Sequence, residues 1–352
     1  MRISSSAKCA SIAAAVTLLA ACNNAASQLE FAPSGATQQN AVKSILHAQP
    51  LRSSLATTSG AITAHPDHSR SWMDPDAKKD DLFYISDNGT DDVYIYAYEP
   101  GRGKTLVGTL TGFSSPKGIC VDKAGNVFIT NQVPLRVGPS TVVEYAHGGT
   151  HPIATLIDSA YYPYGCSVDP VTGNLAVTNA STSYSYGPGD VAIYPNAKGA
   201  PINYLDSDFD QYFFCGYDNK GNLFVDGLSS GSASEFAKLP KGSKTLKSIT
   251  LNQTVQLPGG VQWDGKYVAI GDQIAATIYQ FNVSGSVGTK VGITPLNGGN
   301  YVRQFWIYGR KVIGPDNQGA NVKFWNYPGG GTATKSINNF KYPIAATVSP
   351  AK

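Results

Sequence analysis

Short apolar runs recur along most of the chain, and turn-forming residues separate them. In one stretch they occupy residues 118–122, 127–130, 141–145 and 152–157. These runs are rich in β-branched and aromatic residues, which fit β-strands, and no segment keeps a long helical period. The pattern predicts four short β-strands in this stretch.

The four-strand pattern repeats with a recognisable first turn. A marker position falls at residues 74, 122, 169, 218, 264 and 308, and a partial copy follows at residues 344–349. The marker is an aspartate in every copy except the one at Tyr308, and at Asp122 and Asp218 it opens the sequence Asp-x-x-Gly-Asn. Glycine and asparagine accept the positive φ that tight hairpins need, and the aspartate side chain can hydrogen-bond the turn backbone. The repeat therefore places a hairpin after each first strand.

Six copies of a four-stranded antiparallel unit predict an all-β protein, a six-bladed β-propeller. One blade cannot bury both of its faces alone, and a closed ring packs each blade against two neighbours. A pair of β-sandwich domains would not explain six copies in register. The first-strand motif occurs once more than the other strands, so we expect the strand at residues 344–348 to meet the N-terminal blade and close the ring. The sequence does not decide which copy is innermost there.

The repeat also resembles a known class. The pattern Pro-x-Gly-apolar-x-Val-Asp-x-x-Gly-Asn, seen over residues 68–350, resembles the NHL repeat and, more loosely, the gluconolactonase and strictosidine-synthase-like propellers. The resemblance extends to uncharacterised bacterial lipoproteins that carry such repeats. It implies the fold and leaves the function open, because propellers host both enzymes and binding proteins.

The N-terminal segment has the features of an export signal. Arg2 and Lys8 precede a small apolar run at residues 9–21, which is shorter than the about 20 residues that a membrane anchor needs. The run ends Leu-Ala-Ala-Cys22, which resembles the lipobox of bacterial lipoproteins and implies cleavage before Cys22 and a lipid on its thiol. An ordinary secretory signal with an incidental Cys22 is the alternative. We thus expect a signal peptide at 1–21, the lipidated Cys22 with a flexible linker at 22–66, and the propeller at 67–352.

The resemblance also implies a location. In that lipoprotein family a residue other than aspartate after the lipidated cysteine, here Asn23, favours the outer membrane or cell surface over the inner membrane. Two or more acyl chains hold a protein on a bilayer that one chain holds poorly. We expect an exported protein anchored to a bacterial membrane by its N-terminal lipid.

Composition and charge narrow the possible classes. Charged residues make up 14% of the chain and hydrophobic residues 42%, with 37 Gly, 21 Pro and 20 Tyr, which excludes a coiled coil and a disordered chain. The formal net charge of +3 falls by two when Arg2 and Lys8 leave with the signal. No nucleic-acid partner is expected from so small a charge, and we expect a monomer.

Polar residues end most of the predicted second strands and supply the first candidate site. They are Asp87, Asn131, Asn179, Asp226, Asp272 and Asp316. Such oxygens bind Ca²⁺ or hydrogen-bond sugar hydroxyls, so a metal, if present, would lie among Asp87, Asn131, Asn179, Asp272 and Asp316. The alternative is that these side chains cap the turn after each second strand. No other cofactor is expected.

Tyrosines gather before the first strands, on the face that these loops should share. The candidates are Tyr161, Tyr164, Tyr212, Tyr301 and Tyr342. A tyrosine offers a flat apolar ring and a polar tip, which suit a partly wet binding surface for a glycan or a protein. The alternative is packing between blades.

The sequence favours a binding or scaffolding module over an enzyme. It has no histidine on a predicted first strand and no nucleophile elbow, phosphate loop or zinc spacing. The gluconolactonase resemblance implies a Glu, Asn and Asp set around a divalent metal, but Glu99, Glu144 and Glu235 lie in or just beyond third strands. A Ca²⁺-dependent lactonase-like hydrolase with an Asp/Asn site remains the alternative.

Three cysteines belong to the predicted propeller. Cys166 and Cys215 both stand three residues before the marker, on adjacent first strands, whereas Cys120 stands two before it. An exported protein permits disulfides, so Cys166–Cys215 is the candidate bond. The alternative is three buried free thiols.

Overall fold

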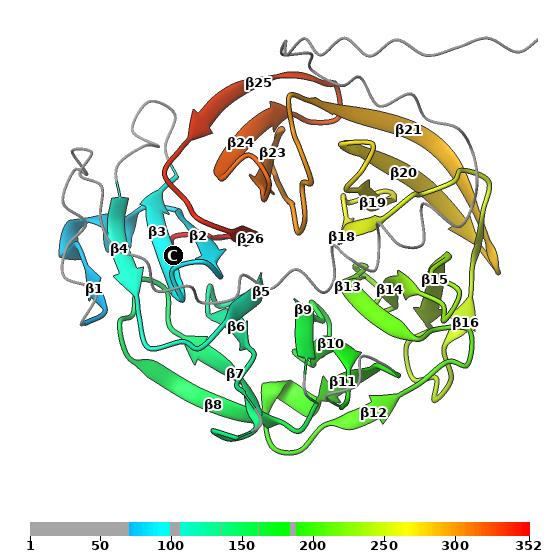
Figure 1. Ribbon diagram of the computed structural model, residues 1–352, viewed down its shortest axis with the longest axis horizontal. Helices are drawn as coiled ribbons and strands as arrows, with labels where there is room; N and C mark the ends of the chain where they lie inside the picture. Colours follow the sequence, from blue (N-terminus) through cyan, green and yellow to red (C-terminus); the bar gives the residue numbers. More distant parts are fainter. Residues whose placement is uncertain (1–69, 99–105, 135, 161, 184–187) are drawn as a thin grey trace, which may run out of the picture.

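The computed structural model describes residues 70–98, 106–134, 136–160, 162–183 and 188–352. Antiparallel sheets stand around a central axis and form a β-propeller (Figure 1). Residues 1–69 and Tyr161 lie outside the described residues, so the expected signal, the linker and Cys22 have no structural account. Within the described ranges, no helix has the length and apolar character needed to span a bilayer.

The predicted four-stranded antiparallel unit is confirmed. One sheet contains β5 (Pro116–Val121), β6 (Val127–Asn131), β7 (Ser140–Tyr145) and β8 (Pro152–Asp158). The next two contain β9 (Tyr162–Val168), β10 (Leu175–Ser181), β11 (Asp190–Tyr194) and β12 (Ile202–Tyr204), and then β13 (Gln211–Tyr217), β14 (Leu223–Leu228), β15 (Ser234–Leu239) and β16 (Lys247–Ser248).

Two further four-stranded runs join into one sheet through a parallel contact of their outer strands, β21 and β25. The first run is β18 (Pro258–Trp263), β19 (Val268–Asp272), β20 (Thr277–Ser284) and β21 (Val287–Asn297), with the short β17 (Thr250–Leu251) beside β21. The second is β22 (Trp306–Tyr308), β23 (Lys311–Asp316), β24 (Asn321–Asn326) and β25 (Gly330–Ile337).

The remaining sheet joins the two ends of the described chain. Its order is β1 (Trp72–Met73), β4 (Leu106–Leu110), β3 (Asp92–Ala97), β2 (Leu82–Asp87) and β26 (Pro343–Ser349). The expected closure by the C-terminal strand is confirmed, and β26 is the innermost strand. The first copy of the motif becomes the outermost strand, and its marker Asp74 caps the short 3-10 helix at Pro75–Lys79. A second 3-10 turn lies at Pro195–Ala197.

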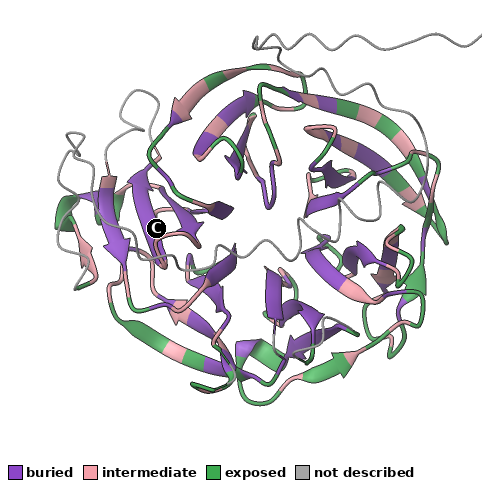
Figure 2. Cartoon of the chain, viewed as in Figure 1, coloured by how far each residue is buried: buried purple, intermediate pink, exposed green. Residues whose placement is uncertain are grey.

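Burial follows from the stacking of blades. Strands near the axis, such as β2, β6, β10 and β26, are buried at every residue, because each blade has a neighbour on both faces (Figure 2). Outer strands such as β8 and β21 alternate between buried and exposed positions. This difference explains why the inner strands have near-continuous apolar sequences.

The first turns are built as the marker motif predicts. Asp122 Oδ1 accepts from the Asn126 backbone N–H at 2.8 Å, and Asp218 Oδ1 accepts from Asn222 in the same way at 2.9 Å. Gly125, with φ of 77°, supplies the positive φ of the turn. The repeated aspartate therefore shapes these hairpins.

The disulfide joins a different pair from the candidate one. Cys120 is bonded to Cys166 with a Cα–Cα distance of 5.6 Å, and Cys215 is a buried free thiol, so the predicted Cys166–Cys215 bond is wrong. Cys166 and Cys215 each stand two residues before the end of their strand, and Cys120 one residue before. Side chains alternate along a strand, so Cys166 and Cys215 point to the same side of successive blades, and Cys120 points back toward Cys166. Cys215 accordingly faces the preceding blade, with its Sγ 3.9 Å from the carbonyl of Ala176.

Peptide mapping tests this pairing. Alkylation of the unfolded, unreduced protein should modify Cys215 and leave a Cys120–Cys166 cross-linked peptide. Replacing both bonded cysteines by alanine should lower the free energy of unfolding by about 2–4 kcal/mol, because the unfolded chain loses a long-loop constraint. Cys215→Ala serves as the matched control and should keep the cross-linked peptide. A modified Cys120 in the unfolded, unreduced protein would contradict the pairing.

Candidate functional site

The residues that end the second strands hold the loops that enter the inner strands. In three blades, Asp87, Asn131 and Asp272 accept hydrogen bonds from the backbone of such a loop. The donors are, in turn, the N–H groups of Lys341 and Tyr342, of Ser114 and Ser115, and of Gln256 and Leu257, at 2.7–3.5 Å. Burial raises the pKa of Asp87, and these N–H bonds act in the opposite direction. Asp87 and Asp272 also accept N–H bonds from the turn after their own strand, as the capping alternative predicts.

The other three second-strand residues also bond locally. Asn179 Nδ2 donates to Asp190 at 2.7 Å, and Asp226 Oδ1 accepts from the backbone N–H of Phe214 at 2.8 Å. Asp316 accepts from the Gly319 backbone and pairs with Lys323. Over the described ranges no three His, Cys, Asp or Glu side chains lie close enough to hold a metal ion.

Asp226 differs from the other acids in its surroundings. It is fully buried, its Oδ2 has no hydrogen-bond partner, and burial raises its pKa well above the ordinary value. By contrast, both carboxylate oxygens of Asp272 accept backbone N–H bonds. The same residue type thus has one acceptor contact in one blade and several in another.

Two of the predicted tyrosines meet at an arginine. Arg303 Nη1 donates to the Tyr164 hydroxyl at 2.6 Å, and its Nη2 donates to the Tyr342 hydroxyl at 2.9 Å. The Tyr162 and Tyr164 rings stack with centroids 6.1 Å apart. Lys117 Nζ lies 3.3 Å from the Tyr162 hydroxyl and 4.9 Å from its ring centroid. We call Lys117, Tyr162, Tyr164, Arg303 and Tyr342 the cationic cluster.

The cationic cluster stands at the N-terminal ends of inner strands from four blades. Lys117 is in β5, the stacked tyrosines open β9, Arg303 precedes β22 and Tyr342 precedes β26. The pairing register shifts near the start of β5, between Pro116 and Ile119. A β-bulge of this kind re-aims side chains.

Electrostatics in the cluster are dominated by burial. Burial, reinforced by the Arg303 charge and opposed by the Asp91 charge, lowers the pKa of Lys117 to about 7. Burial raises the pKa of Tyr164 to about 12, so its hydroxyl stays neutral beside Arg303. Sequence reasoning missed both cations, although each stands before or within a predicted first strand.

The remaining tyrosines have structural surroundings. Tyr212 is completely buried, its ring stacks on Phe209 at 4.6 Å, and its hydroxyl accepts from the Asp206 backbone N–H at 2.6 Å. Tyr301 has a φ of 61° and packs against a hydrophobic cluster, and its carbonyl accepts from the Asn317 N–H at 3.2 Å. Neither residue contacts the cationic cluster through a hydrogen bond.

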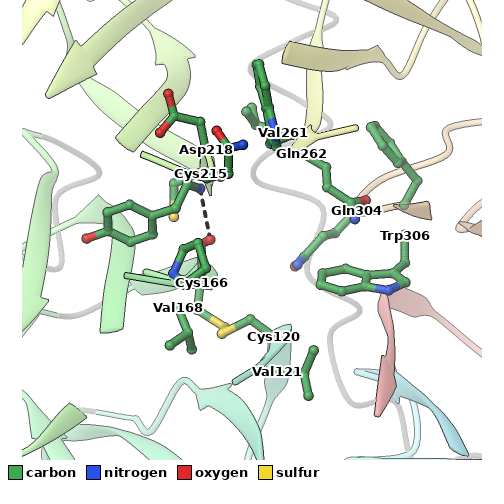
Figure 3. Close-up of a pocket in the computed structure, with 17 residues that line it drawn as sticks. Cys120, Val121, Cys166, Val168, Cys215, Asp218, Val261, Gln262, Gln304 and Trp306 are labelled. Atoms are coloured by element: carbon green, nitrogen blue, oxygen red, sulfur yellow. Dashed lines mark hydrogen bonds between the residues drawn. A yellow bond between two sulfur atoms is a disulfide. The ribbon is translucent and has the colours of Figure 1, made fainter. Parts of the chain in front are cut away.

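A cavity of about 290 Å³ occupies the axis toward the C-terminal ends of the inner strands (Figure 3). Tyr217, Trp263 and Trp306 supply aromatic walls, and Gln262 and Gln304 supply amides. The complete lining is Cys120, Val121, Cys166, Ser167, Val168, Pro170, Cys215, Gly216, Tyr217, Asp218, Asn219, Val261, Gln262, Trp263, Gln304, Phe305 and Trp306. We call this space the axial cavity; sequence reasoning did not find it.

Gln304 links the axial cavity to the cationic cluster. Its side chain reaches Ile119 of β5, donating to the carbonyl at 2.8 Å and accepting from the N–H at 3.3 Å. It lines the cavity, and the next residue toward the N-terminus is Arg303 of the cluster. The amide thus lies between two chemically different environments on one axis, one aromatic and one cationic.

Several solved structures share this fold. A chain from the nidogen/laminin complex aligns over 77% of this chain and 99% of its own length, with 12% identity and a TM-score of 0.62. A functionally unknown protein from Desulfotomaculum acetoxidans covers 80% and 89%, with 14% identity and a TM-score of 0.53. A putative 6-phosphogluconolactonase from Bacteroides fragilis covers 77% and 98%, with 12% identity and a TM-score of 0.54.

No protein-family model matches the chain, and no curated protein matches it in sequence. At such low identity the structural likenesses describe architecture alone. They support a β-propeller.

The contrast between Asp226 and Asp272 gives a test of capping. Asp272→Asn should lower the free energy of unfolding by about 2 kcal/mol, because an NH₂ group replaces an oxygen that accepts backbone N–H bonds. For Asp226 the folded-state pKa is raised, so the native carboxyl keeps a proton that the unfolded chain releases. The contribution of Asp226 to the free energy of unfolding of the wild type therefore falls as pH rises above about 4.

Asp226→Asn removes that titration. Its stability relative to the wild type should increase from pH 4.5 to pH 8 in chemical denaturation, while the Asp272→Asn deficit should persist at pH 8. A pH-independent difference between Asp226→Asn and the wild type would contradict the assignment.

Proposed function

We propose that this protein is a six-bladed β-propeller that acts as a non-catalytic binding module and takes one sugar-sized part of a glycan into the axial cavity. The observation that carries the proposal is the axial cavity itself. Its volume of about 290 Å³ lies at the lower end of the range of small-molecule sites, and aromatic walls with a few polar groups are typical of such sites. The tryptophan and tyrosine rings offer flat apolar faces, and the amides offer hydrogen bonds.

The count of six blades is supported by the strand order. The sheet that contains β18 to β25 holds two antiparallel four-stranded runs, and the other four sheets each hold one blade. The innermost strands β26, β5, β9, β13, β18 and β22 contact one another in cyclic order. Each blade therefore has an inner strand at the axis (Figure 1).

Binding is favoured over hydrolysis because of the surroundings of the acids. The carboxylates at the ends of the second strands accept backbone or side-chain hydrogen bonds that hold loops in place. A metal-dependent lactonase needs carboxylates that converge on an open coordination site. No observation on the described residues favours that alternative.

The proposal includes the membrane tether expected from the sequence. Lipid on Cys22 would hold the propeller at the surface of a bacterial outer membrane, and 44 linker residues would span on the order of 35–40 Å. The test is labelling of cells with a clickable palmitate analogue. The wild-type chain should carry the label and Cys22→Ser should lose it; label that persists in Cys22→Ser would contradict the tether.

Blocking the axial cavity tests the binding role. Val168 lines the cavity, so Val168→Trp should fill it and lower the affinity for a bound glycan at least tenfold. Val171 is exposed at 48% on the adjoining turn, so Val171→Trp is a matched control and should bind like the wild type. The measurement is a glycan array followed by calorimetry with the glycan that is retained. Retention of no glycan, or equal binding by Val168→Trp, would overturn the proposal.

A further inference from the structure

The cationic cluster contains two buried positive side chains close together. Lys117 is 3% exposed and Arg303 is 6% exposed. Lys117 contacts the hydroxyl of Tyr162, and Arg303 contacts the hydroxyl of Tyr164. The rings of these two tyrosines stack on each other. Two like charges taken out of water at one place are costly unless an opposite charge accompanies them.

The direct hydrogen-bond partners of these two cations are neutral tyrosine hydroxyls. Arg303 donates to the hydroxyls of Tyr164 and Tyr342, and its Nε has no hydrogen-bond partner. Lys117 donates to the Tyr162 hydroxyl and feels the charge of Asp91. Neither cation forms an ion pair with a carboxylate in the described part of the chain. The tyrosines accept hydrogen bonds, but they do not supply a compensating charge.

The side chains of the cationic cluster carry many hydrogen-bond donors, and none of these side chains is an anion. A tyrosine hydroxyl that accepts from Arg303 still has its own O–H to donate. A guanidinium has a fixed fork of donors that matches the oxygens of a carboxylate or a phosphate, and an ammonium adds a point charge. These chemical features select an oxyanion over a neutral sugar or a cation.

We propose that the cationic cluster is a second binding site, which takes a compact oxyanion, a carboxylate or phosphate group, between Arg303 and Lys117. The site is at the opposite end of the inner strands from the axial cavity, and it does not depend on what that cavity binds. The anion would supply the missing charge and accept from Arg303, Lys117 and the tyrosine hydroxyls. Its binding should favour the charged form of Lys117.

Anion-dependent stability of the full chain tests the proposal. The melting temperature is measured with increasing inorganic phosphate or acetate, against chloride at matched ionic strength. A ligand that binds only the folded state raises that temperature with saturation. We expect saturable stabilisation by at least one of the two probes, and the two arms separate phosphate from carboxylate recognition.

Two lysine variants make the test specific. Lys117→Met should raise the melting temperature in chloride, because it removes the repulsion with Arg303, and should weaken the apparent anion affinity about tenfold. Lys220→Met removes an exposed lysine of the β13–β14 turn and should leave the anion response unchanged. Equal anion responses in the wild type and Lys117→Met, or no saturable response in the wild type, would overturn the proposal.

A direct readout does not need a variant. The Lys117 side-chain signal, followed by nuclear magnetic resonance during a pH titration, should show a pKa near 7 in chloride and a higher value with the stabilising anion. An unchanged Lys117 titration with that anion bound would contradict the site.

Discussion

Face-to-face packing of blades is the constraint on which the rest of the structure depends. A strand such as β2 or β10 is buried at every residue, and this is favourable only while a neighbour covers each face. Closing the ring meets this requirement for all blades at once. The closing strand β26 is buried at every position, where it pairs with β2 and contacts β5 of the next blade.

The same packing sets the chemistry available at the axis. Inner strands from different blades converge there, so residues far apart in the sequence become neighbours. Lys117 and Arg303 meet at one end of the inner strands, and Trp263 and Trp306 line a cavity at the other. Between these two ends, the Gln304 side chain bonds to the backbone of Ile119. The ring therefore holds two chemically different environments, one at each end of the inner strands.

Local sequence predicted local structure well. The repeat predicted the four-stranded unit, the first-turn hairpins and closure by the C-terminal strand, because these features depend on side-chain alternation and on turn residues such as Asp122 and Gly125. The cationic cluster was harder to predict. Lys117 and Arg303 stand in blades separated by about half of the chain, and no periodicity connects them. The disulfide partner was wrong because equivalent positions on successive blades point the same way, whereas Cys120 and Cys166 occupy non-equivalent positions on facing sides.

The position of β26 also has a consequence for biosynthesis. The blade that holds β2, β3 and β4 lacks its innermost strand until the ribosome has passed residue 349. The earliest-made strands therefore cannot complete their blade during translation, and the ring stays open until the last strand is made. An open ring exposes apolar blade faces, so the nascent chain has a built-in delay before it becomes compact. Such a delay is compatible with transport across a membrane as an unfolded polypeptide.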